Sequence, residues 1–537
     1  MAGTATARAQ EKSADVKLVI GASSAGTIFE WYDFFIYGTL AASGIIGRTF
    51  FPAGNEVLQS LLAWAGFAVG FGFRPLGAIL FGYLGDRLGR KYTFLVTIVL
   101  MGVATAGVGL VPSAETIGIA APILIILLRI AQGLALGGEY GGAAVYVAEH
   151  AAPEKRGFYT SFIQASVVGG FVLSLAVVLL VKGGMDSATW DSWGWRIPFL
   201  LSLILLAISL WMRLKLSESP VFAAMKEEGE VAGNPFVESF TYPRNKRRIF
   251  VALFGIAAGL TVIWYTAMFS ALSFLQGPMR VEATAAQVIV GLSALGGMGF
   301  FILFGRISDR VGRKRPIVIG YILTLILLFP LFKLMGSVAN PALAAAHARA
   351  PVTVSASGCG YDPFASKQAT PCGQLLGELT RLGVEYTVEM GAKAQPVLRA
   401  GPTSLVDPAP QAVKPFLEGA GYDFAPVVPS PGAIAVIVFA LLALSALSGA
   451  TYGPVAALLA EMFPPKIRYS SLSIPYHFGT GYFGGFLPFI ASYVVARTGD
   501  AYAGLWYTWG VVLMALIVAW WGLAGGKPAD FDERDTG

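Results

Sequence analysis

The chain has 537 residues, of which 55% are apolar and only 13% are charged, and its formal net charge is +6. Soluble globular chains are about 25% charged, so this composition excludes a soluble multidomain protein, and the high apolar content excludes a disordered one. Two cysteines are too few for a disulfide-rich scaffold. Apolar runs of about 20 residues, the length that a helix needs to cross a ~30 Å hydrocarbon layer, instead predict an all-α polytopic membrane protein.

Twelve apolar runs are separated by short polar or Gly/Pro breaks, and each predicts one membrane-spanning helix. In chain order the predicted spans are 18–46, 60–84, 92–111, 119–147, 158–181, 197–216, 249–276, 286–305, 316–335, 432–460, 470–496 and 503–524. The first 17 residues are polar and contain no apolar segment before a small-residue cleavage site. The first span is therefore expected to be retained rather than removed as a signal peptide.

The basic residues predict how the spans are oriented. Most of the 38 lysines and arginines fall in the two tails and in the connections after spans 2, 4, 6, 8 and 10. Because basic residues are retained on the cytoplasmic side of a membrane, we expect both termini to be cytoplasmic. The positive charge thus reflects topology, and no basic stripe with interleaved aromatics indicates nucleic-acid binding.

Two loop motifs occur twice, which predicts two parallel halves of six spans each. The pattern Gly-x-x-x-Asp-Arg-x-Gly-Arg-Lys at 82–91 returns 223 residues later at 305–314. The pattern Ala-Glu-x-x-x-Pro-x-x-Arg at 148–156 returns 312 residues later at 460–468. Both pairs fall on equivalent loops, as a duplicated six-helix unit requires. Because the two offsets differ by 89 residues, the second half must carry an insert, which we place at 336–431.

The chain therefore divides into two bundles, a central loop and an insert. The predicted boundaries are 1–216 for the N-terminal bundle, 217–248 for the central cytoplasmic loop, 249–335 for spans 7 to 9, 336–431 for the insert, and 432–537 for spans 10 to 12 with a short tail. The insert follows span 9, which places it in the periplasm. It contains both Cys359 and Cys372. Cysteines confined to an oxidising compartment are candidates for a disulfide, with two unpaired thiols as the alternative.

The repeated loop at 82–91 and 305–314 resembles the signature of the major facilitator superfamily, and the resemblance covers nearly all of the chain outside the insert and the tails. Segments 30–38, 129–143 and 217–222 look like the metabolite:proton symporter family within it. The insert is similar to that of members described as haloacid or general organic-acid permeases. The resemblance implies twelve spans in two pseudo-symmetric six-helix bundles, alternating access, and import of organic acids, proline or betaine with protons.

The resemblance also implies that the repeated loops act as conformational latches. The residues concerned are Gly82, Asp86, Arg87, Gly89, Arg90 and Lys91 in the first copy and Asp309, Arg310, Gly312, Arg313 and Lys314 in the second. Glycine lets two helices approach closely, Asp caps or pairs at a helix end, and the basic cluster anchors the loop to anionic lipid headgroups. Anchoring of the loop to lipid headgroups would be enough to explain a single copy of the motif. Two copies 223 residues apart are not explained by chance.

Ionisable side chains inside membrane spans cost free energy to insert, and they usually mark the pathway of a substrate or an ion. They are concentrated in the first half, at Glu30, Asp33, Arg74, Arg129 and Glu139. Glu30 and Asp33 are three residues apart and so share a helical face. We expect Asp33 to carry the coupling proton, with Glu30 or Glu139 as alternatives. For Arg129 the resemblance implies a role in proton transfer. A static ion-pair network with the two arginines is the competing interpretation.

Arg74 and Arg129 are also candidate clamps for a substrate carboxylate, because a planar guanidinium can bind two carboxylate oxygens. Each could instead be an internal partner of the intramembrane acids. Further candidates to line the cavity are Gln164, Trp264, Tyr265, Gln276, Tyr452, Tyr476 and His477. Helix packing or an interfacial position explains each of these equally well.

Together these features predict a proton-coupled importer of a small organic acid anion in a bacterial inner membrane, monomeric and not an enzyme. We expect no cofactor besides the coupling proton and no metal, because the His and Cys residues lack ligand spacing. A symporter for betaine or proline is the first alternative, which cavity aromatics favour. A drug/proton antiporter is disfavoured because 158–181 lacks a Gly-Pro pattern. A receptor or substrate-capturing carrier that uses the insert is the alternative from another class.

Overall fold

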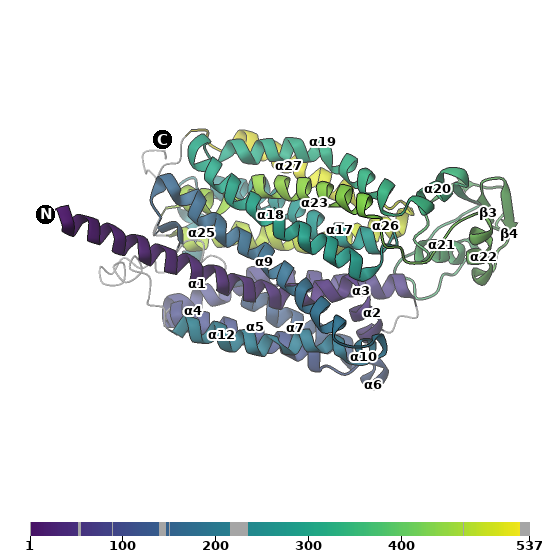
Figure 1. Ribbon diagram of the computed structural model, residues 1–537, viewed down its shortest axis with the longest axis horizontal. Helices are drawn as coiled ribbons and strands as arrows, with labels where there is room; N and C mark the ends of the chain where they lie inside the picture. The colour runs from purple at the N-terminus through teal and green to yellow at the C-terminus, as the bar shows by residue number, and fades with distance from the viewer. Residues whose placement is uncertain are drawn as a thin grey trace.

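The computed structural model describes residues 2–51, 55–88, 90–138, 147–149, 151–214, 235–464 and 467–526. Within these ranges the side chains of 2–19, 22, 82–83, 85–88, 90–94, 213 and 235 are not described. The molecule is a bundle of long helices with a small α/β domain, the insert, at one end (Figure 1). The start of helix α1 (Ala2–Ala42) and the end of helix α27 (Leu505–Gly522) lie at the opposite end (Figure 1). We call the two ends of the bundle the insert end and the terminus end.

Long apolar helices form the bundle in chain order. The first half contains α1 (Ala2–Ala42), α3 (Glu56–Gly72), α4 (Arg74–Leu88), α5 (Arg90–Leu110), α7 (Ala120–Gly137), α9 (Arg156–Gly183), α11 (Ile197–Leu200) and α12 (Ser202–Leu214). The second half contains α15 (Asn245–Phe250), α16 (Ala258–Tyr265), α17 (Ala271–Gln276), α18 (Ala283–Val311), α19 (Lys314–Ala339), α23 (Pro431–Tyr452), α24 (Val455–Met462), α25 (Arg468–Phe478), α26 (Leu487–Thr498) and α27 (Leu505–Gly522). Shorter helices α2 (Ile45–Phe50), α6 (Ala114–Ile117), α10 (Ser187–Ser192) and α14 (Pro235–Thr241) connect or flank them.

Ten helical runs in the described part of the chain are long and apolar enough to cross a membrane, and Leu95–Leu110 is a shorter apolar helix. The second part of α1 coincides with the first predicted span, which ends early because the chain turns at Gly44 with φ 75°. The all-α polytopic membrane fold is thus confirmed for the bundle.

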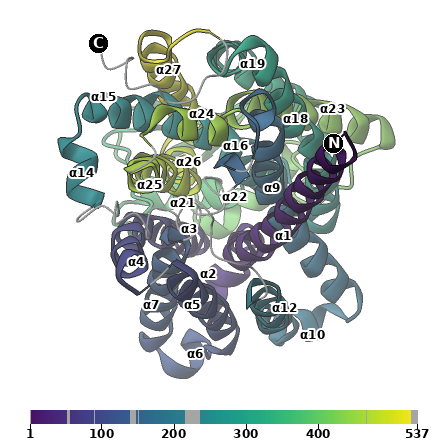
Figure 2. The same cartoon turned by 90° about the vertical axis from the view of Figure 1, so that its left-hand side faces the viewer.

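The two halves meet along a few helices. Viewed from the terminus end, α4, α5, α7 and α12 gather on one side and α19, α24 and α27 on the other (Figure 2). Helix α9 belongs to the first half by sequence but packs along both α1 and α18. Helices α3 and α4 complete the interface by contacting the segment that contains α25. Any rocking of one half against the other therefore has to move these contacts.

Parts of two spans in the second half are π-helical rather than α-helical. The π-helical stretches are Val251–Ala257, Thr266–Ser270 and Gly479–Gly485. The last of them packs against α3 of the first half. π-helical turns within α-helices are rare and are frequent at functional sites.

The insert folds as an α/β domain, which its composition did not predict. Its sheet has the order β2-β1-β3-β4. The strands are β1 (Val352–Ala356), β2 (Tyr386–Met390), β3 (Val397–Ala400) and β4 (Thr403–Val406), and the helices are α20 (Pro341–Arg349), α21 (Pro371–Arg381) and α22 (Pro410–Gly419). β1 pairs parallel with β2 and antiparallel with β3, which pairs antiparallel with β4. A disulfide joins Cys359, which follows β1, to Cys372 in the first turn of α21.

The insert is attached mainly to the second half of the bundle. Arg280, just before α18, donates to the carbonyl oxygens of Leu382 (2.5 Å) and Phe424 (3.1 Å), and its guanidinium lies 5.1 Å from the centre of the Phe424 ring. Arg497 donates to the carbonyl oxygen of Tyr361. Val57 of α3, in the first half, also packs against the core of the insert. The insert is therefore held mainly by the second half and also touches the first.

Candidate functional site

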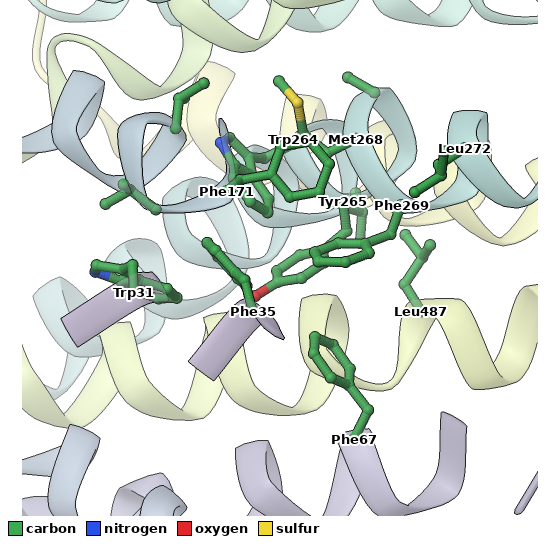
Figure 3. Packing of buried hydrophobic residues seen from close by; sticks show 14 of the residues in the cluster. Trp31, Phe35, Phe67, Phe171, Trp264, Tyr265, Met268, Phe269, Leu272 and Leu487 are labelled. Atoms are coloured by element: carbon green, nitrogen blue, oxygen red, sulfur yellow. The ribbon is translucent and has the colours of Figure 1, made fainter. Parts of the chain in front are cut away.

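A cluster of aromatic side chains joins the two halves at the centre of the bundle (Figure 3). Phe35 of α1 stacks on Trp264 of α16 with ring centres 5.0 Å apart, and Tyr265 stacks on Phe269 at 5.8 Å. Phe35, Tyr265 and Phe269 point toward one another, with Phe67 of α3 below them and Phe171 of α9 beside Trp264 (Figure 3). We call these residues, with Trp31, Phe34 and Phe71, the central aromatic cluster. It is the place where ring faces from both halves meet.

Arg129 of α7 lies fully buried against this cluster. Its guanidinium lies 4.2 Å from the ring centre of Phe34 and 4.4 Å from that of Tyr37. It donates to Gln132 Oε1 at 2.5 Å and to the carbonyl oxygen of Gly66 at 3.3 Å. Within the part of the chain that the structure describes, Arg129 forms no ion pair with a carboxylate. Carbonyl dipoles and aromatic faces therefore stabilise this buried cation in place of an acid.

Arg74, the first residue of α4, is the second fully buried arginine. Its guanidinium lies 5.3 Å from the ring centre of Trp31 and 5.1 Å from that of Phe71. It is also within electrostatic range of Tyr265 and His477. The structure thus brings three of the predicted cavity residues, Arg74, Tyr265 and His477, to one place.

The other predicted cavity residues occupy three separate positions. The hydroxyls of Tyr476 and Tyr452 share a hydrogen bond of 2.6 Å and both residues are buried, and the Tyr476 ring centre lies 5.7 Å from that of His477. Gln164 is fully buried on α9, two helical turns (about 10 Å) from Phe171 toward the terminus end. Gln276, at the end of α17, lies toward the insert end. The predicted cavity residues therefore lie at successive positions along the bundle axis and do not form a single pocket.

Glu30 and Asp33 lie on α1 with only 7% and 5% of their surfaces exposed. Asp33 is close to Glu30 and to Ser202 of α12. Among the described residues, no group donates a hydrogen bond to Asp33 Oδ1. The hydroxyl of Thr105 accepts 2.8 Å from Gln132 Nε2 and donates to the carbonyl oxygen of Met101 at 2.9 Å, while the backbone carbonyl oxygen of Asp33 lies farther away at 3.4 Å.

Since Gln132 Oε1 accepts from Arg129, a short polar chain runs from the Arg129 guanidinium through Gln132 to Thr105, beside the backbone of Asp33. Glu139, the third candidate for the proton, lies outside the described residues. The two acids of α1 are therefore the ones whose surroundings can be specified.

Charged residues cross-link the two halves at the terminus end. Both carboxylate oxygens of Asp309, on α18, accept bonds of 2.8 Å from the backbone N–H groups of Gly157 and Phe158 at the start of α9. Arg313 donates to Asp309 at 2.6 Å, and through Nε and Nη2 it donates to the two oxygens of Glu461 at 3.1 and 2.8 Å. Such charge-assisted and bidentate bonds are about twice as strong as neutral ones.

Two further ion pairs belong to the same network. Arg156 lies 3.5 Å from Glu461, and Arg468 lies 3.3 Å from Glu149. Each pair joins one half to the other. None of these four residues was among the predicted latch residues, although the second repeat, 148–156 and 460–468, contains all of them and was the signal that could have identified them.

The remaining predicted latch residues are described in the second copy of the motif but largely not in the first. Lys314 donates to the carbonyl oxygens of Trp520 (2.6 Å) and Leu523 (2.9 Å) at the end of α27. Gly312 has φ +90°, a conformation that disfavours other residues. Arg310 has an exposed side chain. In the first copy, Gly89 lies outside the described residues, and so do the surroundings of Gly82 and the side chains of Asp86, Arg87, Arg90 and Lys91.

A cavity of about 610 Å³ opens between the halves at the insert end. Helices α2 and α3 line it from the first half, and α17, α26, α27 and the insert line it from the second. Its wall includes Trp64, which is buried and packs edge-on against Phe67 (5.6 Å) and Phe269 (6.0 Å) of the central aromatic cluster. These rings separate the cavity from Arg129. In the described part of the chain, no group of three or more His, Cys, Asp or Glu side chains could hold a metal ion.

Comparisons with known proteins agree with this architecture. The model of the Major Facilitator Superfamily matches residues 23–367. The inner membrane metabolite transport protein YhjE of Escherichia coli is 30% identical, over 93% of both chains. The shikimate transporter of E. coli is 38% identical over 58% of this chain and 70% of its own length. The proline/betaine transporter of E. coli is 35% identical over 60% of this chain, and the match spans 65% of that relative, less than two thirds of its length.

Among solved structures, the partially occluded, inward-open form of the xylose transporter XylE from E. coli superposes with a TM-score of 0.62. The match covers 96% of this chain and 99% of XylE at 16% sequence identity. At this identity the likeness shows the shared fold.

Proposed function

The chain belongs to the major facilitator superfamily, and from this premise we propose that it imports a small organic acid anion, a mono- or dicarboxylate, together with protons. It is a multi-pass membrane transporter of the metabolite-transporting type and not an enzyme.

Arg129 is the observation on which the choice of an anion rests. It is a fully buried guanidinium at the centre of the bundle, and the described residues provide carbonyl oxygens and rings around it but no carboxylate. A substrate carboxylate would supply the missing counter-charge through two parallel hydrogen bonds. Two relatives are named for organic acids, shikimate and alpha-ketoglutarate. Arg74 is the candidate for a second carboxylate.

Asp33 is the proposed proton site. An isolated ionised carboxylate is costly to bury, and binding a proton removes that cost. Asp33 combines deep burial, a neighbouring acid at Glu30 and an oxygen without a hydrogen-bond donor among the described residues. The polar chain from Arg129 through Gln132 ends at Thr105, whose hydroxyl lies 3.4 Å from the backbone carbonyl oxygen of Asp33, so the two sites are close in space.

Alternating access would use the two ends of the bundle. We place the terminus end in the cytoplasm, following the basic residues, and the insert end in the periplasm. The network around Asp309 closes the cytoplasmic side, while the cavity at the insert end admits substrate as far as Trp64. Movement of the aromatic rings would then admit the anion to Arg129, and breaking the network would release it inside.

The test is uptake of labelled acids into proteoliposomes with an imposed pH gradient. Wild-type protein is expected to accumulate at least one of a panel that includes shikimate and alpha-ketoglutarate. Asp33→Asn should lose accumulation but keep exchange of substrate across the membrane, whereas the neighbouring Glu30→Gln should keep both. Full accumulation by Asp33→Asn would contradict the assignment of the proton site. Failure of the wild type to take up any acid would contradict an anionic substrate.

A zwitterionic substrate such as betaine or proline is the second candidate. Trp264, Tyr265 and Phe171 present large ring faces in the central aromatic cluster, and such faces attract quaternary ammonium groups. A relative is named as a proline/betaine transporter. Including betaine and proline in the same uptake panel decides between the two, because an anion carrier should prefer the acids in direct competition.

A further inference from the structure

We propose that the cavity at the insert end is an outer binding site, in which arginines from the first half and from the insert attract the organic anion before it reaches the central aromatic cluster. This inference rests on the proposed function and assigns a role to the insert. Its cavity of about 610 Å³ lies in the range of small-molecule sites in proteins. The insert contributes Thr380, Arg381 and Pro426 to the wall.

Exposure shows which parts of the cavity face outward. Arg48, Glu56 and Arg381 line it and have exposed side chains, whereas Trp64 and Leu61 line it and are buried. The charged residues therefore stand at the outer rim and the apolar ones toward the centre of the bundle. An ion that enters from the periplasm meets the charged rim first.

The rim carries an excess of positive charge. Arg48, Arg280 and Arg381 line the cavity, and Glu56 is the acid that lines it with them. Arg280 already holds the insert in place through Leu382 and Phe424. Arg48 and Arg381 are therefore the candidate anion-binding groups, one from each side of the cavity.

Glu378 forms an ion pair with Arg381 and also orients it. It lies one turn before Arg381 on α21 and accepts from Arg381 Nε at 2.9 Å and Nη2 at 2.5 Å. Those two bonds fix the plane of the guanidinium and leave Nη1 for another partner. Glu56 also lies within electrostatic range of Arg381 and Arg280. With both acids counted, the three arginines leave a net excess of one positive charge at the rim, which attracts anions.

The polar groups of the cavity wall can bind a carboxylate that is still hydrated. Ser60, Ser273 and Ser492 supply hydroxyl groups, and Gln276 supplies an amide. Hydroxyl and amide groups can donate to carboxylate oxygens directly or through water. The outer site is therefore expected to bind weakly and to act by raising the local concentration of anion above Trp64.

The test measures initial uptake of labelled shikimate and alpha-ketoglutarate by proteoliposomes over a range of concentrations. Arg48→Gln and Arg381→Gln are each expected to raise the half-saturation concentration roughly fivefold at low ionic strength, with the maximal rate unchanged. The dicarboxylate should be affected more than the monocarboxylate. Raising the salt to about 0.15 M, with osmolarity matched by sucrose, should shrink the difference because exposed charges are screened.

Two matched variants control for structure. Arg381→Lys keeps the charge and should behave nearly as the wild type. Arg399→Gln removes an exposed arginine from β3 of the same insert, outside the cavity wall, and should change nothing. If the wild type takes up the acids and both rim variants keep its half-saturation concentration and salt dependence, the outer site is overturned while the proposed function stands. If the wild type takes up neither acid nor any other of the panel, the proposed function itself fails.

Discussion

The two ends of the bundle hold the halves together by different chemistry. At the terminus end, Asp309, Arg313 and Glu461 form directional, charge-assisted bonds between helices of opposite halves. At the insert end, Trp64, Phe67 and Phe269 pack by ring contacts, and Lys182 of α9 donates one longer bond of 3.3 Å to the hydroxyl of Thr284 on α18. A hydrogen bond is lost when its donor or acceptor atom is replaced, whereas the packing energy of aromatic rings decreases gradually as contact area is removed. The difference predicts that substitutions at the terminus end act in an all-or-none way and those at the insert end in a graded way.

The largest effect is expected for Asp309→Asn. The amide keeps at most one of the acceptor positions used by Gly157 and Phe158, and it leaves Arg313 without its nearest charge partner. Because hydrogen bonds to charged groups contribute about 1.5–3 kcal/mol each, uptake should fall by at least about tenfold. Labelling of an introduced Ser161→Cys, buried beneath this network, should rise in parallel, since the protein's own cysteines are both in the disulfide.

The control for that variant is Asp423→Asn, at an exposed position in the insert. It should leave uptake and Ser161→Cys labelling unchanged. Wild-type labelling in Asp309→Asn would show that the network does not hold the terminus end closed.

A smaller effect is expected for Trp64→Ala. The substitution removes two edge-on ring contacts, each of which contributes about 0.5–1.5 kcal/mol, so efflux of preloaded substrate should accelerate roughly fivefold while uptake continues. Trp193→Ala, an exposed tryptophan in the loop before α11, is the matched control. Unchanged efflux would mean that the rings do not limit passage from the cavity.

Removing the disulfide should affect the insert more than transport. Replacing both Cys359 and Cys372 with Ser opens a loop with a sequence separation of 13, and loops of about this size contribute about 3 kcal/mol. Proteolysis within the insert should become faster, but the maximal uptake rate should change by less than about twofold, because the central aromatic cluster keeps its contacts. A collapse of the maximal rate would show that the insert takes part in the transport step itself.

The smallest effect concerns pH at the insert end. The backbone N–H and hydroxyl of Thr189 donate to Asp186 at the start of α10 and lower the pKa of that carboxyl. A lowered folded-state pKa means that the cap stabilises α10 above the ordinary Asp pKa and loses this contribution as pH falls through the folded value. Hydrogen-exchange protection of 187–192 should therefore decrease below about pH 4, and Asp186→Ala should show low protection at all pH values.

The sequence predicted the membrane spans and the repeated loops because both are local signals. Hydrophobic length locates helices such as α18 and α19 with little ambiguity, and a motif such as 305–314 can be found by comparison with its first copy. Residues 2–17 were predicted to be a polar tail, yet they continue helix α1. No apolar periodicity marks that extension, so composition could not reveal it.

The sequence could not predict what each buried charge contacts. Arg129 and Asp33 were candidates for one ion-pair network, but Arg129 binds carbonyl oxygens, Gln132 and ring faces. Those partners come from α1, α3 and α7, and their meeting depends on how the helices pack. The α/β fold of the insert was missed for a related reason, since its strands are only four or five residues long and pair across loops.

The π-helical stretches of the second half allow the helical backbone of that half to rearrange locally. A π turn holds one more residue than an α turn in nearly the same length. If the extra residue of Thr266–Ser270 or Gly479–Gly485 moved one position along its span, the side chains it passes would rotate while the length of the span stayed the same. Phe269 sits within the first of these stretches, and its ring would turn as the extra residue shifts. The second half, which carries almost none of the ionisable residues within the spans, therefore has a backbone that can change the direction in which Phe269 points.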